Sequence, residues 1–289
     1  SFEERPKHLD PASSYVVNEY VLIGQIYEPP LQYHFLKRPY ELLPLTATAM
    51  PEVRYFDLAG KALDEDAPAA KVQRAVYTIN IQPGILYQPH PAFARDRKGN
   101  YLYHNLGSAA LADKHVLADF RETGTRELTA EDYIYQIKRL VHPGIHSPIG
   151  GLMAKYILGL QELSERLTRE HVANPQKYLD LRDYPLAGAR AIDRYTIEIT
   201  LKEKYPQLLY WLSMTFFSPM PWEADRFYSQ PGMAEKNIVL DWYPVGTGPY
   251  MLTENNPNRR MVLERNPNFR GEVFPAEGEA GDEAQGFLE

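Results

Sequence analysis

Proline is the residue that most restricts what this chain can fold into. The sequence has 24 prolines among 289 residues, and each one fixes its own backbone angle and lacks an amide hydrogen-bond donor. Helix interiors and central strands exclude such residues, so the chain must be built from short elements joined by shaped loops. With 44% hydrophobic residues it can still form a large core, and its length suits one large domain or two smaller ones.

Three segments carry apolar residues at helical spacing. Residues 19–27 form the first, and the double proline at 29–30 must end it. The second begins at Thr129, with Asp132 placed as the acid of a capping box, and a Pro-Gly pair ends it. We expect the third helix over residues 149–170.

Alternating apolar and polar residues predict strands elsewhere. Residues 72–81 and 191–201 alternate most clearly, and a shorter strand is expected over residues 261–263. The last residues, 272–289, are rich in Gly, Ala and Glu and read as a linker. Helices and strands share the chain, so the expected fold class is mixed α/β.

Composition and charge exclude several classes of function. The formal net charge is −7, and no dense Lys/Arg cluster occurs, so we expect no nucleic-acid partner. The absence of cysteine excludes disulfides and thiolate metal sites, and fits an oxidising compartment. No run of about 18 apolar residues is present to span a membrane.

The sequence contains no catalytic or cofactor motif. Gly-x-Ser-x-Gly is absent, and so are both glycine-rich phosphate-binding signatures. His142 and His146 are four residues apart, but the Pro-Gly pair between them prevents one helical face from presenting both to a metal. We therefore predict no catalytic residue, no metal site and no cofactor.

Three segments in a fixed order resemble a known family. Residues 129–139 read TAEDYIYQIKR, residues 191–201 read AIDRYTIEITL, and residues 245–250 read VGTGPY and are followed by LERNPNF. They are similar to the TAEDV helix, the DDYTV strand and the GTGPY…NPxYW block of the family 5 extracellular solute-binding proteins, the peptide-type receptors of ABC importers. Residues 25–29 and 76–84 match the family more weakly. Arg270 stands where the family usually has Trp.

The resemblance implies a fold and a domain organisation. Family members have a bilobal periplasmic-binding-protein fold of type II, in which two α/β lobes close on a ligand and an α+β subdomain is inserted in the first lobe. Residues 1–44 and 189–269 would form the first lobe, and residues 45–188 the inserted subdomain. Residues 270–289 would begin the crossing to a second lobe, so we expect an N-terminal fragment of a larger receptor.

The resemblance also implies a function without catalysis. The protein would capture a peptide or another small solute between its lobes and deliver it to an ABC permease in the inner membrane. It would act as a monomer in the periplasm, after removal of a signal peptide.

The ligand-binding residues implied by the resemblance come from three segments. The loop at Tyr27, Glu28 and Pro29 would lie at the cleft rim, and Thr247 would shape the turn beside the crossing. Alternatives remain for some of them: Tyr27 could be a core aromatic residue, Glu28 could lie at a solvated helix end, and Thr247 could serve the turn alone. The third segment holds Phe216, Phe217 and Ser218, where the rings would pack on ligand side chains and the hydroxyl would hydrogen-bond; Phe216 could equally be a core residue.

Two functions from other classes stay open. One is a hydrolase whose active site is assembled from residues far apart in the sequence, which generic ester, phosphate or glycoside substrates would reveal. The other is a periplasmic interaction module that uses the same lobe without transport.

Overall fold

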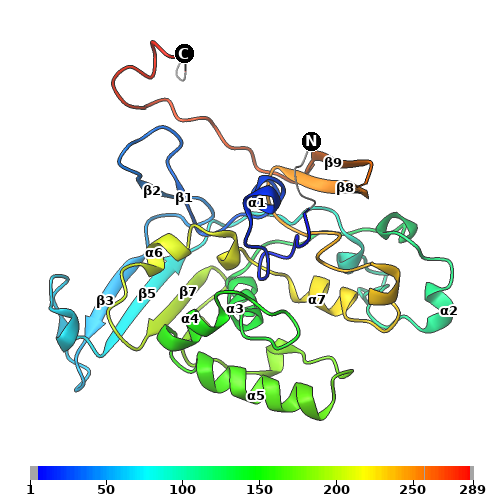
Figure 1. Ribbon diagram of the computed structural model, residues 1–289, viewed down its shortest axis with the longest axis horizontal. Helices are drawn as coiled ribbons and strands as arrows, with labels where there is room; N and C mark the ends of the chain where they lie inside the picture. Colours follow the sequence, from blue (N-terminus) through cyan, green and yellow to red (C-terminus); the bar gives the residue numbers. More distant parts are fainter. Residues whose placement is uncertain (1–5, 257, 287–289) are drawn as a thin grey trace.

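A computed structural model describes residues 6–256 and 258–286 of the chain (Figure 1). Its largest sheet has five strands in the order β4-β3-β5-β7-β6, and every neighbouring pair is antiparallel. The strands are β3 (Glu52–Phe56), β4 (Ala62–Leu63), β5 (Arg74–Asn80), β6 (Ala189–Ala191) and β7 (Thr196–Leu201). The strand predicted over residues 72–81 is confirmed as β5.

The strand predicted over residues 191–201 is wrong in its first part. The chain makes a hairpin there, in which Ala191 on β6 lies opposite Ile197 on β7. The turn forms because the Asp193 carboxylate accepts a hydrogen bond from the Tyr195 amide at 2.8 Å and another from the Thr196 hydroxyl at 2.9 Å. An aspartate that folds back on its own backbone therefore interrupts an apparently continuous alternation.

Helix α3 (Ala130–Arg139) packs on β6 and β7 and is buried along most of its length. It starts as predicted, because the Asp132 carboxylate accepts a hydrogen bond from the Thr129 backbone amide at 2.9 Å. Its other end is also tied down, since the Arg139 guanidinium pairs with Asp10 at 2.6 Å in the core. The helix thus joins the sheet to the N-terminal segment.

The predicted helix over residues 149–170 is two helices, α4 (Gly150–Tyr156) and α5 (Leu160–Ala173). The break occurs where Ile157 forms an antiparallel bridge with Leu201 and the Leu158 amide donates to the Thr200 carbonyl at 3.0 Å. Gly159 then turns the chain with φ 78°, a left-handed conformation that glycine adopts without strain. The pairing with the sheet therefore overrides the helical periodicity.

Helix α1 (Val17–Ile23) confirms the first predicted helix but ends before the double proline, at Gly24. The other short elements are β1 (Leu31–Tyr33), β2 (Leu42–Pro44), α2 (Ser108–Leu111), α6 (Leu208–Trp211), α7 (Trp222–Tyr228), β8 (Tyr250–Asn256) and β9 (Arg260–Arg265). The predicted strand over residues 261–263 lies within β9, which pairs with β8. In the view of Figure 1, α1 and the β8–β9 hairpin lie on the side of the sheet away from α5.

The segment after β9 has no helix or strand within its described part, residues 266–286, in keeping with the expected linker. The final three residues of that prediction lie outside the described residues. The division into a first lobe and an inserted subdomain stays a prediction, and the five-stranded sheet draws strands from both parts because β5 pairs with β7.

A buried ion-pair cluster ties the start of α3 to two distant segments of the chain. The Arg126 guanidinium lies 2.6 Å from the Asp132 carboxylate on α3 and 2.7 Å from the Glu223 carboxylate on α7. Both carboxylates are almost fully buried, and the Tyr101 hydroxyl donates a further bond to Glu223 at 2.9 Å. The cation therefore neutralises two acids that could not be buried without it.

Replacing the cation should strongly destabilise the fold. For Arg126→Met we expect the free energy of unfolding to fall by roughly 3–5 kcal/mol, because two carboxylates then stay buried without a counter-ion. Urea unfolding of the purified protein measures the loss. Arg260→Met is the matched control, since its partner Glu254 lies on an exposed hairpin and the unfolding midpoint should hardly move. Equal effects of the two changes would contradict the assignment.

Burial of His90 predicts a pH dependence. Its imidazole contacts the Tyr228 hydroxyl at 2.8 Å and accepts a hydrogen bond from the Ala92 amide, and burial lowers its pKa to about 3 from the usual 6.5. The unfolded chain therefore takes up a proton that the folded state resists, so stability should decline as the pH falls from about 6.5 towards 3, by up to ~1.4 kcal/mol per pH unit.

The measurement is the urea midpoint as a function of pH. In His90→Asn the slope over that pH range should be shallower than in the parent protein, even if its stability at neutral pH is lower. His115→Asn removes an exposed histidine and should leave the slope unchanged. An unchanged slope in His90→Asn would refute the prediction.

Candidate ligand-binding site

A cavity of about 940 Å³ lies between α1, the loop that follows it and the β1–β2 hairpin. Residues 213 and 215 close one side, and Pro249 and Glu272 contribute from the C-terminal part of the chain. Five aromatic side chains line it: Tyr20, Tyr27, Tyr33, Phe35 and Tyr40. Its lining polar and charged residues are Gln25, Glu28, Gln32, His34, Arg38, Ser213, Thr215 and Glu272. This mixture suits a ligand with both apolar and hydrogen-bonding groups.

Three of the seven predicted site residues, Tyr27, Glu28 and Pro29, line this cavity. A fourth, Thr247, is not among the lining residues but contacts one of them: its hydroxyl donates a hydrogen bond to Glu28 Oε2 at 2.7 Å. Their role towards a ligand stays a prediction, but the structure brings together residues that are 219 positions apart.

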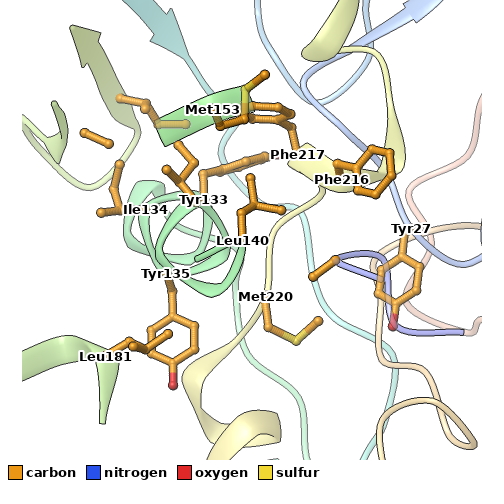
Figure 2. Close-up of a cluster of buried hydrophobic side chains, with 14 of the residues drawn as sticks. Tyr27, Tyr133, Ile134, Tyr135, Leu140, Met153, Leu181, Phe216, Phe217 and Met220 are labelled. Atoms are coloured by element: carbon orange, nitrogen blue, oxygen red, sulfur yellow. The ribbon is translucent and has the colours of Figure 1, made fainter. Parts of the chain in front are cut away.

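The other three predicted residues lie elsewhere. Phe216, Phe217 and Ser218 are buried and are not among the residues that line the cavity. Figure 2 shows both phenylalanines within a cluster of buried side chains together with Tyr133 and Met153. The Phe216 carbonyl accepts a hydrogen bond from the Gln136 side chain at 2.9 Å, which anchors this segment to α3. A ligand could reach it only if the segment moved.

A glycine turn holds the loop in place. The Gly248 amide donates to the Ile26 carbonyl at 2.8 Å, and the Tyr250 amide donates to the Gln25 carbonyl at 3.0 Å. The backbones are so close that a Cβ on Gly246 would lie 1.9 Å from the Ile26 carbonyl oxygen, and one on Gly248 2.7 Å from the Gln25 oxygen. Only glycine fits at these two positions.

Glu28 is the most constrained polar group of the site. Its Oε2 accepts hydrogen bonds from Thr247 and from Arg270 Nη1, the latter at 2.8 Å. Its Oε1 is buried and has no hydrogen-bond partner among the described residues. Burial raises the pKa of the Glu28 carboxyl above its usual value, and the hydrogen bond and charge of Arg270 oppose that rise.

Sequence reasoning missed two parts of the site. Arg270 was visible only as a departure from the family's usual Trp, and nothing local linked it to Glu28. The aromatic rim was also missed: the rings of Tyr33 and Tyr40 lie 5.7 Å apart, edge to face, and the Arg38 guanidinium lies 4.4 Å from the Tyr40 centroid. Both tyrosines are exposed, Tyr33 by 40% and Tyr40 by 67%, so this rim could pack on an apolar ligand side chain.

The described residues, 6–256 and 258–286, contain no group of three or more His, Asp or Glu side chains placed to hold a metal ion. None of their helices is long and apolar enough to cross a membrane.

Adding a methyl group to the glycine turn should test its close approach. We expect Gly246→Ala to lower the free energy of unfolding by about 3 kcal/mol, because the clash is with a backbone carbonyl that cannot move aside cheaply. Urea unfolding reports the change. Gly151→Ala is the control: it lies in α4 with open space around it, so it should be neutral or slightly stabilising. A neutral Gly246→Ala would disprove the contact.

Comparison with known proteins identifies the family. The family model for bacterial extracellular solute-binding proteins, family 5, matches residues 123–279. The periplasmic oligopeptide-binding protein OppA of Escherichia coli is 30% identical over 156 residues, which are 54% of this chain and 25% of that protein. The chain thus matches about a quarter of the length of this relative.

Solved structures agree on the fold. The periplasmic binding protein DppA from Helicobacter pylori, in complex with a peptide, superposes with a TM-score of 0.56 at 19% identity, covering 93% of this chain and 38% of that one. The murein tripeptide-binding protein MppA of Escherichia coli gives 0.54, also at 19% identity, covering 93% and 38%. The fold is therefore that of the type II periplasmic binding proteins, of which this chain covers a part.

The family match spans more than half of the chain. It includes the three segments that carry the resemblance: α3, the β6–β7 hairpin and the glycine turn at residues 245–250. The chain belongs to the bacterial extracellular solute-binding proteins, family 5.

Proposed function

We propose that the chain forms the first lobe of a periplasmic receptor that binds a peptide or a similar small solute and delivers it to an ABC permease. The observation that carries the proposal is the 940 Å³ cavity, which lies at the loop that the family resemblance assigns to the cleft rim. Glu28 and the aromatic rim supply the two kinds of contact that an amphipathic solute needs.

The C-terminal segment supports a second lobe opposite this cavity. After β9 the chain passes the β1–β2 hairpin, where the Gln32 side chain donates to Glu272 at 2.9 Å and the rings of Phe35 and Phe274 stack 6.0 Å apart. In Figure 1 the segment runs beside the β1–β2 hairpin towards the C-terminus, and the Arg38 amide donates a hydrogen bond to the Glu279 carboxylate. We propose that it leads to a lobe that covers the cavity, with residues 1–44 and 189–269 as the first lobe and residues 45–188 inserted.

Peptide is the ligand class that the relatives favour. OppA is named as an oligopeptide-binding protein, and DppA was solved with a peptide. In an extended peptide each backbone amide can donate a hydrogen bond, and side-chain selectivity can stay loose. A signal peptide, a monomeric state and the permease partner belong to the same proposal.

Native mass spectrometry of the full-length gene product tests the function. After mild purification we expect an added mass of a few hundred daltons that is released on denaturation and can be sequenced as peptide. A bare protein that also binds no member of a tri- to pentapeptide library by calorimetry would overturn the peptide assignment.

The 289-residue chain alone is the informative control. Closure of two lobes should supply most of the affinity, so we expect this chain to bind the same peptide at least about 100-fold more weakly than the full-length product does. Equal affinity would show that the second lobe contributes nothing.

A further inference from the structure

The Glu28 carboxylate is satisfied on one oxygen only. Thr247 and Arg270 both donate to Oε2, whereas Oε1 is buried without a partner among the described residues. A buried carboxylate oxygen without a donor destabilises the site. Glu28 lines the cavity, so a ligand group that reached Oε1 would supply the missing donor.

Arg270 is held firmly against this carboxylate. Its second terminal nitrogen, Nη2, donates to the Leu45 carbonyl at 3.3 Å, and its guanidinium lies 5.5 Å from the ring centroid of Phe269. Its side chain is only a quarter exposed, so the ion pair with Glu28 is poorly screened by solvent. The guanidinium therefore balances the charge of Glu28 before any ligand arrives.

This arrangement has a consequence for the charge of the ligand. A cationic group brought to Oε1 would share the carboxylate with a second cation only a few ångströms away, and like charges in a buried site repel. A neutral donor, such as an amide N–H or a hydroxyl, would satisfy Oε1 without that repulsion. The Glu28–Arg270 pair thus offers hydrogen bonding at Oε1 but carries no net negative charge.

We propose that Arg270 is the specificity-determining residue of the cavity: by pairing with Glu28 it makes the site select a neutral hydrogen-bond donor over an ammonium group at that position. The inference rests on the proposed function, because it concerns the same cavity. It goes further in assigning the charge of one ligand group and the residue that decides it.

Tetra-alanine peptides provide the probe. At each position in turn, one peptide carries Lys and its partner carries Gln, and a further pair has a free or an acetylated N-terminus. Calorimetry on the full-length gene product gives the ratio of the two dissociation constants for each pair. At one of these positions we expect the neutral member to bind more tightly.

The variants shift that ratio in opposite directions. In Arg270→Gln the buried carboxylate loses its counter-ion, so the ratio at that position should move by about 10-fold or more towards the cationic member. In Glu28→Gln the unpaired Arg270 should disfavour the cationic member further. The remaining positions should respond little to either change.

Two controls separate the ion pair from general charge effects. Arg270→Lys keeps the cation and should keep the parent preference. Arg260→Gln removes one positive charge from the exposed β9 strand and should leave every ratio unchanged. Circular dichroism and urea unfolding confirm that each variant is folded, and the Glu28→Gln result stands even if Arg270→Gln fails to fold.

The outcomes distinguish this inference from the proposed function. If the parent protein binds these peptides and no ratio changes in either variant, the inference is wrong while the receptor function stands. If the parent protein binds no peptide, the peptide function fails and the inference fails with it. If the ratio of dissociation constants shifts at one peptide position, in opposite directions for Arg270→Gln and Glu28→Gln, the result supports both the inference and the receptor function.

Discussion

The close contact between the glycine turn and the loop after α1 is the constraint on which the candidate binding site depends. Gly246 and Gly248 bring two backbones together that are more than 200 residues apart in sequence, at distances where a Cβ would overlap the carbonyl oxygens of Ile26 and Gln25. That approach places Thr247 beside Glu28, and the β8–β9 hairpin that follows returns the chain to Arg270. The positions of both hydrogen-bond partners of Glu28 therefore depend on two glycines that have no side chain.

The sequence predicted those parts of the fold that local chemistry decides. The start of α3 could be foreseen because the Thr129–Asp132 pair supplies its own cap, and β5 because its alternation extends over a whole strand. The break between α4 and α5 could not, because it is made by a bridge between Ile157 and Leu201 on a distant strand. The spacing of apolar side chains predicts a helix, but it carries no information about a distant strand whose backbone pairs with the same residues.

The residues of the candidate binding site also differ in whether a local segment of sequence could predict them. Tyr27, Glu28 and Pro29 could be placed at the cavity because family resemblance assigns a continuous loop to the cleft rim, and the structure lines the cavity with them. Phe216 and Phe217 have the composition of a ligand contact, but their position against α3 makes them core residues of this chain. Arg270 acquires its meaning only from a partner 242 residues away, which no local pattern encodes.

Two arginines that each pair with a buried carboxylate show how the same kind of ion pair can serve structure or ligand selection. Arg126 is shared by two carboxylates, and both terminal oxygens of Asp132 accept hydrogen bonds from it, so that cluster has no capacity left for a ligand. Arg270 meets a single carboxylate and occupies only one of its oxygens. A fully satisfied cluster stabilises the fold, because any change leaves a charge buried alone. A carboxylate with one unpaired oxygen, such as Glu28, is unfavourable until a ligand donates a hydrogen bond to that oxygen. By our proposal, Arg270 then decides which kind of donor the cavity accepts.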